Sequence, residues 1–332
     1  MAIKLLPMMM IKIVGCYYTM YVDNDPSLVM ENIDVSLCTH LFYSFVEFQA
    51  NASVESFHTF DIEYDGLKEF NNLRIKNPHL KTLVVLDYST DDHGNQPIII
   101  EVIADPIRPE KLLKNIVNFL KKYGFNGIDL TLTDIPQRGI RPSDKGNLVL
   151  FLKALRGKFD KECLILSANV SPNETTAEIL YDIKGISTYL NFINLKTFDF
   201  HGISDAEKKV GHTSPLYPSS KENAEERKKN IDDVVKYWIS HAAPLNKLIL
   251  GTAFSGISYT LADPKQIGEG ASFIKEGDYD HLTGYYEICD FIKKWTYLYD
   301  KEQEVPYIYQ GNQIIAYEDV QSIKAKAEYA KK

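Results

Sequence analysis

The order of apolar and amphipathic segments constrains the fold of this chain more than any other feature of its sequence. Short runs rich in β-branched and aromatic residues alternate with longer stretches whose apolar residues recur at helical spacing. Strands that are apolar throughout are buried on both faces, so repeated strand–helix units of this kind predict a parallel sheet covered by helices. The predicted strands are 11–18, 40–46, 82–87, 127–132, 164–170, 192–197 and 247–253.

The amphipathic stretches between these runs are predicted to be helices, and several begin with Asp, Ser or Pro, which favour helix starts. The pattern changes after the last predicted strand, where residues 258–310 are rich in Gly, Tyr and Asp and carry one predicted helix at 288–299. We therefore expect a small α+β insertion in that segment. The helices predicted before it are 65–76, 109–123, 143–159, 175–183 and 224–242.

These patterns favour an α/β barrel of the TIM (β/α)8 type, with no evident eighth strand, or a doubly wound sheet, and 332 residues can build such a barrel as one domain. We expect residues 11–257 and 311–332 to form the barrel, 258–310 the insertion and 1–10 an N-terminal extension. Natural proteins cover exposed sheet edges, so the apolar segment Ala2–Met10 or a partner chain is predicted to lie between the first and seventh strands.

The charge and hydropathy of the chain argue against two classes of partner. Its formal net charge is −8 at pH 7 and Lys and Arg are scattered, so no positively charged surface for nucleic acid is expected. No apolar stretch reaches the roughly 20 residues that cross a bilayer, which argues against membrane insertion. A hydrophobic content of 45% predicts a sizeable folded core.

Cysteines and glycosylation sequons favour a secreted protein. Cys16 and Cys38 lie at the first two predicted strands, which would be neighbours in a barrel, and a disulfide between them is predicted. Asn51, Asn169 and Asn173 each begin an Asn-x-Ser/Thr triplet that can accept an N-linked glycan. Residues 1–10 do not resemble a signal peptide, because no small-residue cleavage site follows them.

The fourth predicted strand, F-N-G-I-D-L-T-L-T-D at 125–134, is the segment most informative about chemistry. Alternate residues of a strand point the same way, so Asp129, Thr131 and Thr133 are predicted to face the mouth of the barrel, where barrel enzymes place their chemistry. The segment resembles D-G-x-D-x-D-x-E, the pattern of the family 18 glycoside hydrolases (chitinases), with Gly127 and Asp129 matching.

The resemblance to family 18 extends over nearly the whole chain. The segment N-L-K-T-F-D-F-H-G at 194–202 is similar to the family's N-L-M-T-Y-D-F-H-G. The resemblance implies a chitinase fold, a chitin-like ligand, and neither a metal nor another cofactor. The remaining blocks that look like the family's occur in its order, at 16–19, 36–40, 211–217, 243–251 and 285–289.

The departures from the family pattern fall on its catalytic positions. Asn126 stands for the first Asp of the pattern, Thr131 for the third and Thr133 for the Glu that acts as general acid, while Phe198 replaces a Tyr that holds the substrate's acetamido group. In this family that acetamido group attacks the anomeric carbon while the acid protonates the glycosidic oxygen. A Thr hydroxyl cannot protonate the glycosidic oxygen near neutral pH. Losing a general acid lowers the rate roughly 10²- to 10⁴-fold. The resemblance therefore implies no catalytic residues and no hydrolysis.

Two acidic residues keep their family positions, and a third offers an alternative. Asp129 is predicted to be a buried, hydrogen-bonded structural carboxyl group, and Asp199 to keep hydrogen bonds at the mouth. Asp134 could serve as a relocated acid, although strand alternation points it into the helix layer.

Sugar binding without cleavage is the function that this pattern leaves open. The residues left to bind N-acetylglucosamine oligomers weakly are Tyr18, Phe45, Tyr88 and Asp199, because the family's Trp positions carry other residues. A binding, signalling or structural protein, with a protein partner or self-association, is therefore expected. The alternatives are a weakly active or relocated-acid glycosidase and a storage protein without a ligand.

Overall fold

The computed structural model of the chain describes residues 12–19, 30–56, 61, 64–88, 98–133, 140–279 and 283–332, except for the side chains of Tyr88 and Thr283. The predicted N-terminal extension, 1–10, lies outside the described residues. The chain divides into two compact units. The first contains Met1–Ala168 and Tyr189–Asn191, and the second contains Asn169–Thr188 and Phe192–Lys332.

The main sheet has the neighbour order β1-β2-β4-β5-β6-β7-β8, and the pairings β1–β2, β2–β4, β4–β5 and β7–β8 are parallel. A short strand, β3, extends β2 as an antiparallel hairpin. Each predicted strand overlaps one of the strands in this order, so the expected parallel sheet is confirmed. The bounds are β1 Gly15–Thr19, β2 His40–Phe48, β3 Val54–Glu55, β4 Lys81–Tyr88, β5 Gly127–Leu132, β6 Ile165–Val170, β7 Phe192–Leu195 and β8 Leu248–Leu250.

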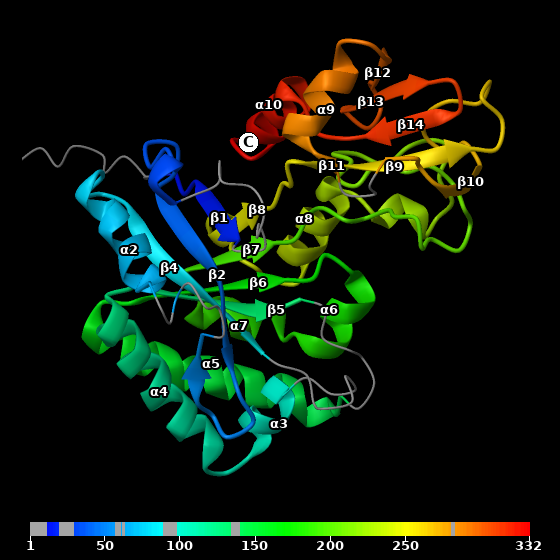
Figure 1. Cartoon of the computed structure of the whole chain (residues 1–332). Coiled ribbons are helices and arrows are strands. Elements are labelled where there is room, and N and C mark those ends of the chain that lie inside the picture. Colours follow the sequence, from blue (N-terminus) through cyan, green and yellow to red (C-terminus); the bar gives the residue numbers. More distant parts are fainter. Residues whose placement is uncertain are drawn as a thin grey trace, which may run out of the picture. The chain divides into compact units, whose positions relative to one another are not determined.

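Helices of the first unit gather on one side of its strands (Figure 1). They are placed by local sequence: Gly124, with φ of 82°, ends α4 in the left-handed conformation that glycine adopts without strain. At the start of α5, the Arg141 amide donates to Asp144 Oδ2 at 2.8 Å, as in a capping box. The sequence pattern did not predict α3. The helices are α2 Gly66–Asn72, α3 Ile98–Ala104, α4 Arg108–Tyr123 and α5 Pro142–Glu162.

The second unit contains a separate antiparallel sheet in the order β10-β9-β14-β13-β12, with β11 paired to β9. The predicted insertion covers most of it, although the sheet begins at Ser255 and ends at Ala316. Its strands are β9 Ser255–Leu261, β10 Phe273–Glu276, β11 Thr283–Gly284, β12 Thr296–Asp300, β13 Val305–Gln310 and β14 Gln313–Ala316. The helices of this unit are α6 Glu174–Leu180, α7 Ile183–Tyr189, α8 Ile231–Ser240, α9 Tyr285–Ile292 and α10 Val320–Tyr329.

The prediction of one helix over 288–299 is wrong in its second half. Helix α9 ends at Ile292, and Thr296–Asp300 is the strand β12, paired with β13 in the register Tyr297 to Ile308. Trp295, just before β12, packs with Phe291 at 5.2 Å between ring centroids. The aromatic residues of this segment therefore pack in a sheet and a turn rather than along one continuous helix.

A buried ion pair fixes α10 within the second unit. Lys326 and Glu318 are each 2% exposed and paired, and Lys326 also donates to Ser214 Oγ at 3.0 Å. Ser322 Oγ donates to the second oxygen of Glu318 at 2.7 Å. Next to this group, His212 accepts from the Ser214 amide at Nδ1, so its Nε2 donates to the Tyr317 carbonyl. A buried charge pair is tolerated only with such added hydrogen bonds.

Lys326→Met should destabilise the protein strongly, because it leaves the Glu318 carboxyl group buried without its cation. The expected loss of unfolding free energy is about 3 to 5 kcal/mol. Lys324→Met on the same helix is the control, since Lys324 is 74% exposed and its loss should cost less than about 0.5 kcal/mol. Urea unfolding followed by tryptophan fluorescence measures both. Equal stability of the two variants would contradict this role of the pair.

A second buried group in this unit consists of two acids bridged by neutral side chains. Gln303 Nε2 donates to Glu222 Oε1 at 3.0 Å, and the Tyr307 hydroxyl donates to Glu269 Oε2 at 3.3 Å. Burial, with the nearby charge of Glu222, raises the pKa of Glu269 to about 8. Burial also raises the pKa of Glu222. At neutral pH, Glu269 is therefore largely protonated.

Glu269→Gln should stabilise the protein at alkaline pH relative to the wild type. A carboxyl group whose pKa rises on folding stabilises the folded state fully below its unfolded pKa of 4.5, and this contribution is lost as the pH rises through about 8. The unfolding free energy of the wild type minus that of the variant should fall by about 4 kcal/mol across this window. Urea unfolding near pH 5 and pH 9 measures this difference. The exposed Glu328→Gln should show no such trend, and parallel behaviour of both variants would exclude the proposed titration.

Candidate functional site

Asn126 lies at the start of β5, at the end opposite the expected catalytic mouth. Its side-chain Oδ1 accepts from the Thr82 amide at 3.0 Å and from Arg74 Nη1 at 3.3 Å. Its own amide donates to the Thr82 carbonyl at 2.8 Å. Burial lowers the pKa of Arg74. Asn126 therefore joins β4 to β5 and accepts one hydrogen bond from the partly buried guanidinium of Arg74.

Asp129 is the carboxyl group at the centre of β5, and none of its surface is exposed. Its Oδ2 accepts from the Tyr17 hydroxyl of β1 at 2.7 Å, and its Oδ1 accepts from Ser167 Oγ of β6 at 2.6 Å. At Gly127 a Cβ atom would lie 2.0 Å from the Ile165 carbonyl oxygen, so only glycine lets β6 approach β5 this closely. Both oxygens of Asp129 are thus engaged in holding strands of the first unit.

The bond from Tyr17 to Asp129 requires a strongly curved sheet. In the neighbour order, β2 and β4 lie between β1 and β5. In a flat sheet, three strand spacings would place β1 about 14 Å from β5. The side chains of Tyr17 and Asp129 could not reach each other over that distance. The strands of the first unit therefore curl so that Tyr17 and Asp129 face each other across the concave side. Sequence analysis missed Tyr17 and Ser167; the alternation of β1, which places Tyr17 and Tyr18 on opposite faces, is the signal that could have indicated the first.

The end of β5 carries hydroxyl and apolar side chains, as its sequence indicates. Thr131 is half-buried, Leu132 is fully buried and Thr133 is 5% exposed. Within residues 127–133, Asp129 carries the only carboxyl group. Asp134, the candidate relocated acid, lies outside the described residues.

Tyr18, one of the predicted ligand residues, packs against aromatic rings. Its ring packs 6.0 Å from that of Phe70 on α2 and 6.1 Å from that of Tyr43, on the helix side of β1. Burial raises the pKa of Tyr18. Because neighbouring strand residues alternate, Tyr17 takes the concave side instead. The ring of Tyr18 therefore lies against α2 rather than beside Asp129.

The other predicted ligand residues of the first unit lie on β2 and β4. Phe45 is half-buried and follows a cis peptide bond with Ser44, at an irregularity in the register with β4 between Tyr43 and Val46. Tyr88 is the last residue of β4, and its side chain lies outside the described part of the structure.

Phe198 and Asp199 follow β7 in the second unit, where both interact with Lys196. The Lys196 ammonium lies 5.8 Å from the centroid of the Phe198 ring and 3.5 Å from Asp199 Oδ2. Asp199 has φ of 60°, and half of its side chain is exposed. Phe198 presents no hydroxyl, so the polar groups at this point are the carboxyl of Asp199 and the ammonium of Lys196.

No tryptophan offers a flat surface to a sugar ring. The chain has two Trp. Trp238 on α8 is fully buried and packs with Tyr181 at 5.7 Å between centroids. Trp295 is 8% exposed.

The predicted Cys16–Cys38 disulfide is present, with 6.0 Å between the Cα atoms. Asn51 lies in an exposed turn and Asn173 is the exposed N-cap of α6, accepting from the Thr176 amide at 3.0 Å. Asn169 is half-buried within β6. Among the described residues there is no group of side chains that could hold a metal ion, and none of their helices is long and apolar enough to cross a membrane.

Comparison with known proteins agrees with this arrangement. The sequence profile of the glycosyl hydrolases family 18 matches residues 13–332. Chitotriosidase-1 of Mus musculus is 33% identical over 313 residues, which cover 90% of this chain and 65% of the mouse protein. The chain thus spans less than two thirds of that relative's length.

Solved structures are similar over almost the whole chain. The Group IV chitinase of Ostrinia furnacalis in complex with allosamidin superposes with a TM-score of 0.86 at 30% identity, covering 96% of this chain and 88% of the insect chain. Human YKL-39, described as a pseudo-chitinase with retained chitooligosaccharide binding properties, gives a TM-score of 0.83 at 29% identity, covering 96% and 89%. Profile, sequence and structure agree that this chain belongs to the glycosyl hydrolases of family 18.

Proposed function

We propose that this chain is a chitinase-like member of family 18 that does not hydrolyse chitin and binds N-acetylglucosamine oligomers weakly. The observation that carries the proposal is Thr133, which stands at the position of the family's general acid. Only 5% of this residue is exposed, and an alkyl hydroxyl does not deliver a proton to a glycosidic oxygen near neutral pH.

Two further positions support the loss of the reaction. Thr131 replaces the Asp that orients the substrate's acetamido group, and Phe198 replaces the Tyr that holds it. Asp129 cannot substitute as an acid, because it is fully buried and both of its oxygens accept hydrogen bonds. When several groups act together on one transition state, the effects of replacing them on the reaction rate are not additive.

Weak sugar binding is supported by the rings and polar groups that remain. Aromatic faces can pack on pyranose rings without any acid, and Phe45 is still half-exposed. The pseudo-chitinase YKL-39 is described as retaining chitooligosaccharide binding. The buried state of both Trp residues argues for low affinity in this chain. A protein partner or self-association would be compatible with the same role.

An extracellular location belongs to this proposal. A disulfide between Cys16 and Cys38 persists in oxidising compartments and is rare where thiols are kept reduced. Asn51 and Asn173 are exposed, as acceptors of N-linked glycans must be.

The purified chain should release no product from a fluorogenic chitobioside between about pH 4 and pH 8. Thr133→Glu alone should recover little, because Thr131 and Phe198 still lack the groups that orient the acetamido carbonyl. The triple variant Thr131→Asp, Thr133→Glu, Phe198→Tyr should be more active than any of its single variants. Turnover by the wild type at about 1 s⁻¹ or faster, the range of ordinary enzymes, would contradict the proposal.

If the wild type proved active, Asp134→Asn would decide whether that residue is the relocated acid. A silent wild type that also bound no chito-oligosaccharide would instead favour a storage or structural protein.

A further inference from the structure

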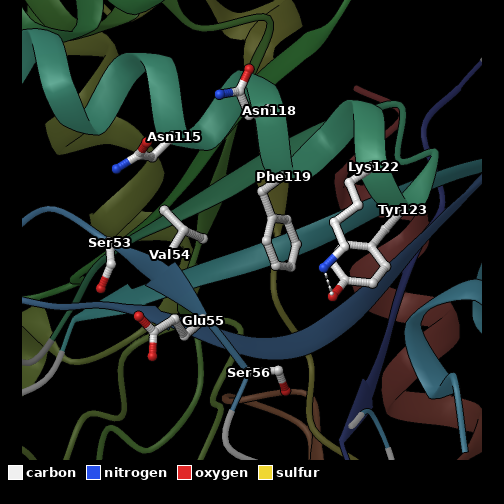
Figure 2. A pocket seen from close by; sticks show the side chains of 9 residues that line it. All are labelled: Ser53, Val54, Glu55, Ser56, Asn115, Asn118, Phe119, Lys122 and Tyr123. Carbon is white, nitrogen blue, oxygen red and sulfur yellow. Dashed lines mark hydrogen bonds between the residues drawn. The ribbon is translucent and has the colours of Figure 1, made fainter.

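A hollow of about 460 Å³ lies in the first unit between α4 and the β2–β3 hairpin (Figure 2). Its lining offers a ligand no open ring face, because Phe119 is 8% exposed and the Lys122 ammonium lies 4.6 Å from the centroid of the Tyr123 ring. The hollow therefore selects no particular ligand. Unused hydrogen-bonding groups lie instead at one edge of the antiparallel sheet in the second unit.

Strand β12, Thr296–Asp300, forms one edge of this sheet (Figure 1). It pairs with β13 on one side, and no described strand pairs with its other side. Within the described part of the chain, only β13 exchanges backbone hydrogen bonds with 296–300. The backbone groups that point away from β13 are therefore left for another strand.

The opposite edge, β10, is protected in two ways that β12 is not. Its register with β9 shifts between Phe273 and Lys275, and the segment 208–210 lies along its start. In that segment, the Lys208 carbonyl accepts from the Phe273 amide at 2.9 Å. Bulges and covering segments stop a sheet edge from pairing with another chain. By contrast, β12 keeps a regular register with β13 and contains no Pro.

The groups that β12 directs outward are the N–H and C=O of Tyr297 and Tyr299. Tyr299 lies opposite Pro306 on β13, and the Pro306 carbonyl accepts from the Tyr317 amide at 3.4 Å, on the side of β14. Each residue of an antiparallel strand directs both of its backbone groups to one side. Pro306 therefore faces β14, and Tyr299 faces away from β13. Tyr297 points the same way, because it lies two residues before Tyr299.

A second copy of the same strand satisfies this outward row. Two antiparallel copies related by a twofold axis at Leu298 place Tyr297 of each copy opposite Tyr299 of the other, and each such pair exchanges two backbone hydrogen bonds. The same register brings Lys294 opposite Glu302, and these exposed residues carry opposite charges. The strand is thus complementary to itself in hydrogen bonding and in charge.

The two tyrosine side chains are already held in place for such a contact. The Tyr297 hydroxyl donates to Asp319 Oδ2 at 2.9 Å, and the Tyr299 hydroxyl donates to Glu304 Oε2 at 2.8 Å. Tyr297 is still 43% exposed. Aromatic side chains that face each other on neighbouring antiparallel strands stabilise a sheet. Pairing with a second copy would therefore bury a tyrosine ring as well as satisfy the backbone.

We propose that β12 is the contact between two copies of this chain, which join their antiparallel sheets edge to edge in a symmetric dimer. The inference goes beyond the proposed function and does not depend on it, because it uses none of the residues on which that proposal rests. An interface of one strand from each copy is smaller than that of a permanent dimer, so the association should be reversible.

Sedimentation equilibrium of the full chain should show this reversible dimer. Lys294→Glu places two acids opposite each other and Glu302→Lys places two ammonium groups, so each variant should weaken the dimer about tenfold, the effect of losing two surface ion pairs. Mixing the two variants restores attraction at both positions of a mixed dimer, which should regain the affinity of the wild type. Lys275→Glu on β10 is the matched control and should associate as the wild type does, since Lys275 is exposed at the other edge.

Hydrogen exchange at low and high protein concentration locates the contact. The amides of Tyr297 and Tyr299 should gain protection on association, and those of 273–276 should not. A wild type that stays monomeric up to about 1 mM would overturn the proposal. Association that neither charge variant weakens, that the mixture does not recover, or that leaves Tyr297 and Tyr299 unprotected would do the same. Equal protection by a Thr-Val repeat peptide would assign this edge to strands of other proteins and would also overturn the dimer.

Discussion

The hydrogen bonds that Asp129 accepts from Tyr17 and Ser167 are the contacts on which the geometry of the first unit depends most. They join β5 to its neighbour β6 and to β1, which lies three strands away in the sheet, and the bond to β1 requires the curl of a barrel rather than a flat sheet. A fully buried carboxyl group would be costly without such partners, and here each oxygen has one. Each oxygen of Asp129 therefore holds a side chain of another strand of the first unit.

Fold and chemistry separate cleanly along β5. The strand is held by backbone pairing, by Gly127 with its close approach to β6, and by Asn126 between Arg74 and Thr82. None of these contacts needs the acidic side chains that the family places at the strand's end. The proposed loss of the reaction is therefore compatible with the family 18 fold.

The parallel sheet could be predicted because buried parallel strands are apolar throughout, as Leu83–Leu86 of β4 are. The Tyr17–Asp129 contact could not, because its partners are 112 residues apart and meet only once the sheet has curled. The segment 296–300 was misassigned because an aromatic-rich run fits a short strand and a helix face equally well. The pair of Lys326 and Glu318 could not be predicted either, because nothing in the sequence of α10 distinguishes Lys326 from its other lysine, and only the fold shows that its side chain reaches Glu318.

The most direct test of this account is the unfolding free energy of Asp129→Asn compared with the wild type. If Asp129 is a structural group, the amide places a donor against the Tyr17 or Ser167 hydroxyl, and stability should fall by about 1 to 3 kcal/mol. The exposed Asp160→Asn serves as a control and should change little. Residues retained for activity often destabilise the fold, and their removal leaves stability unchanged or raised. Unchanged or increased stability of Asp129→Asn would therefore contradict the account.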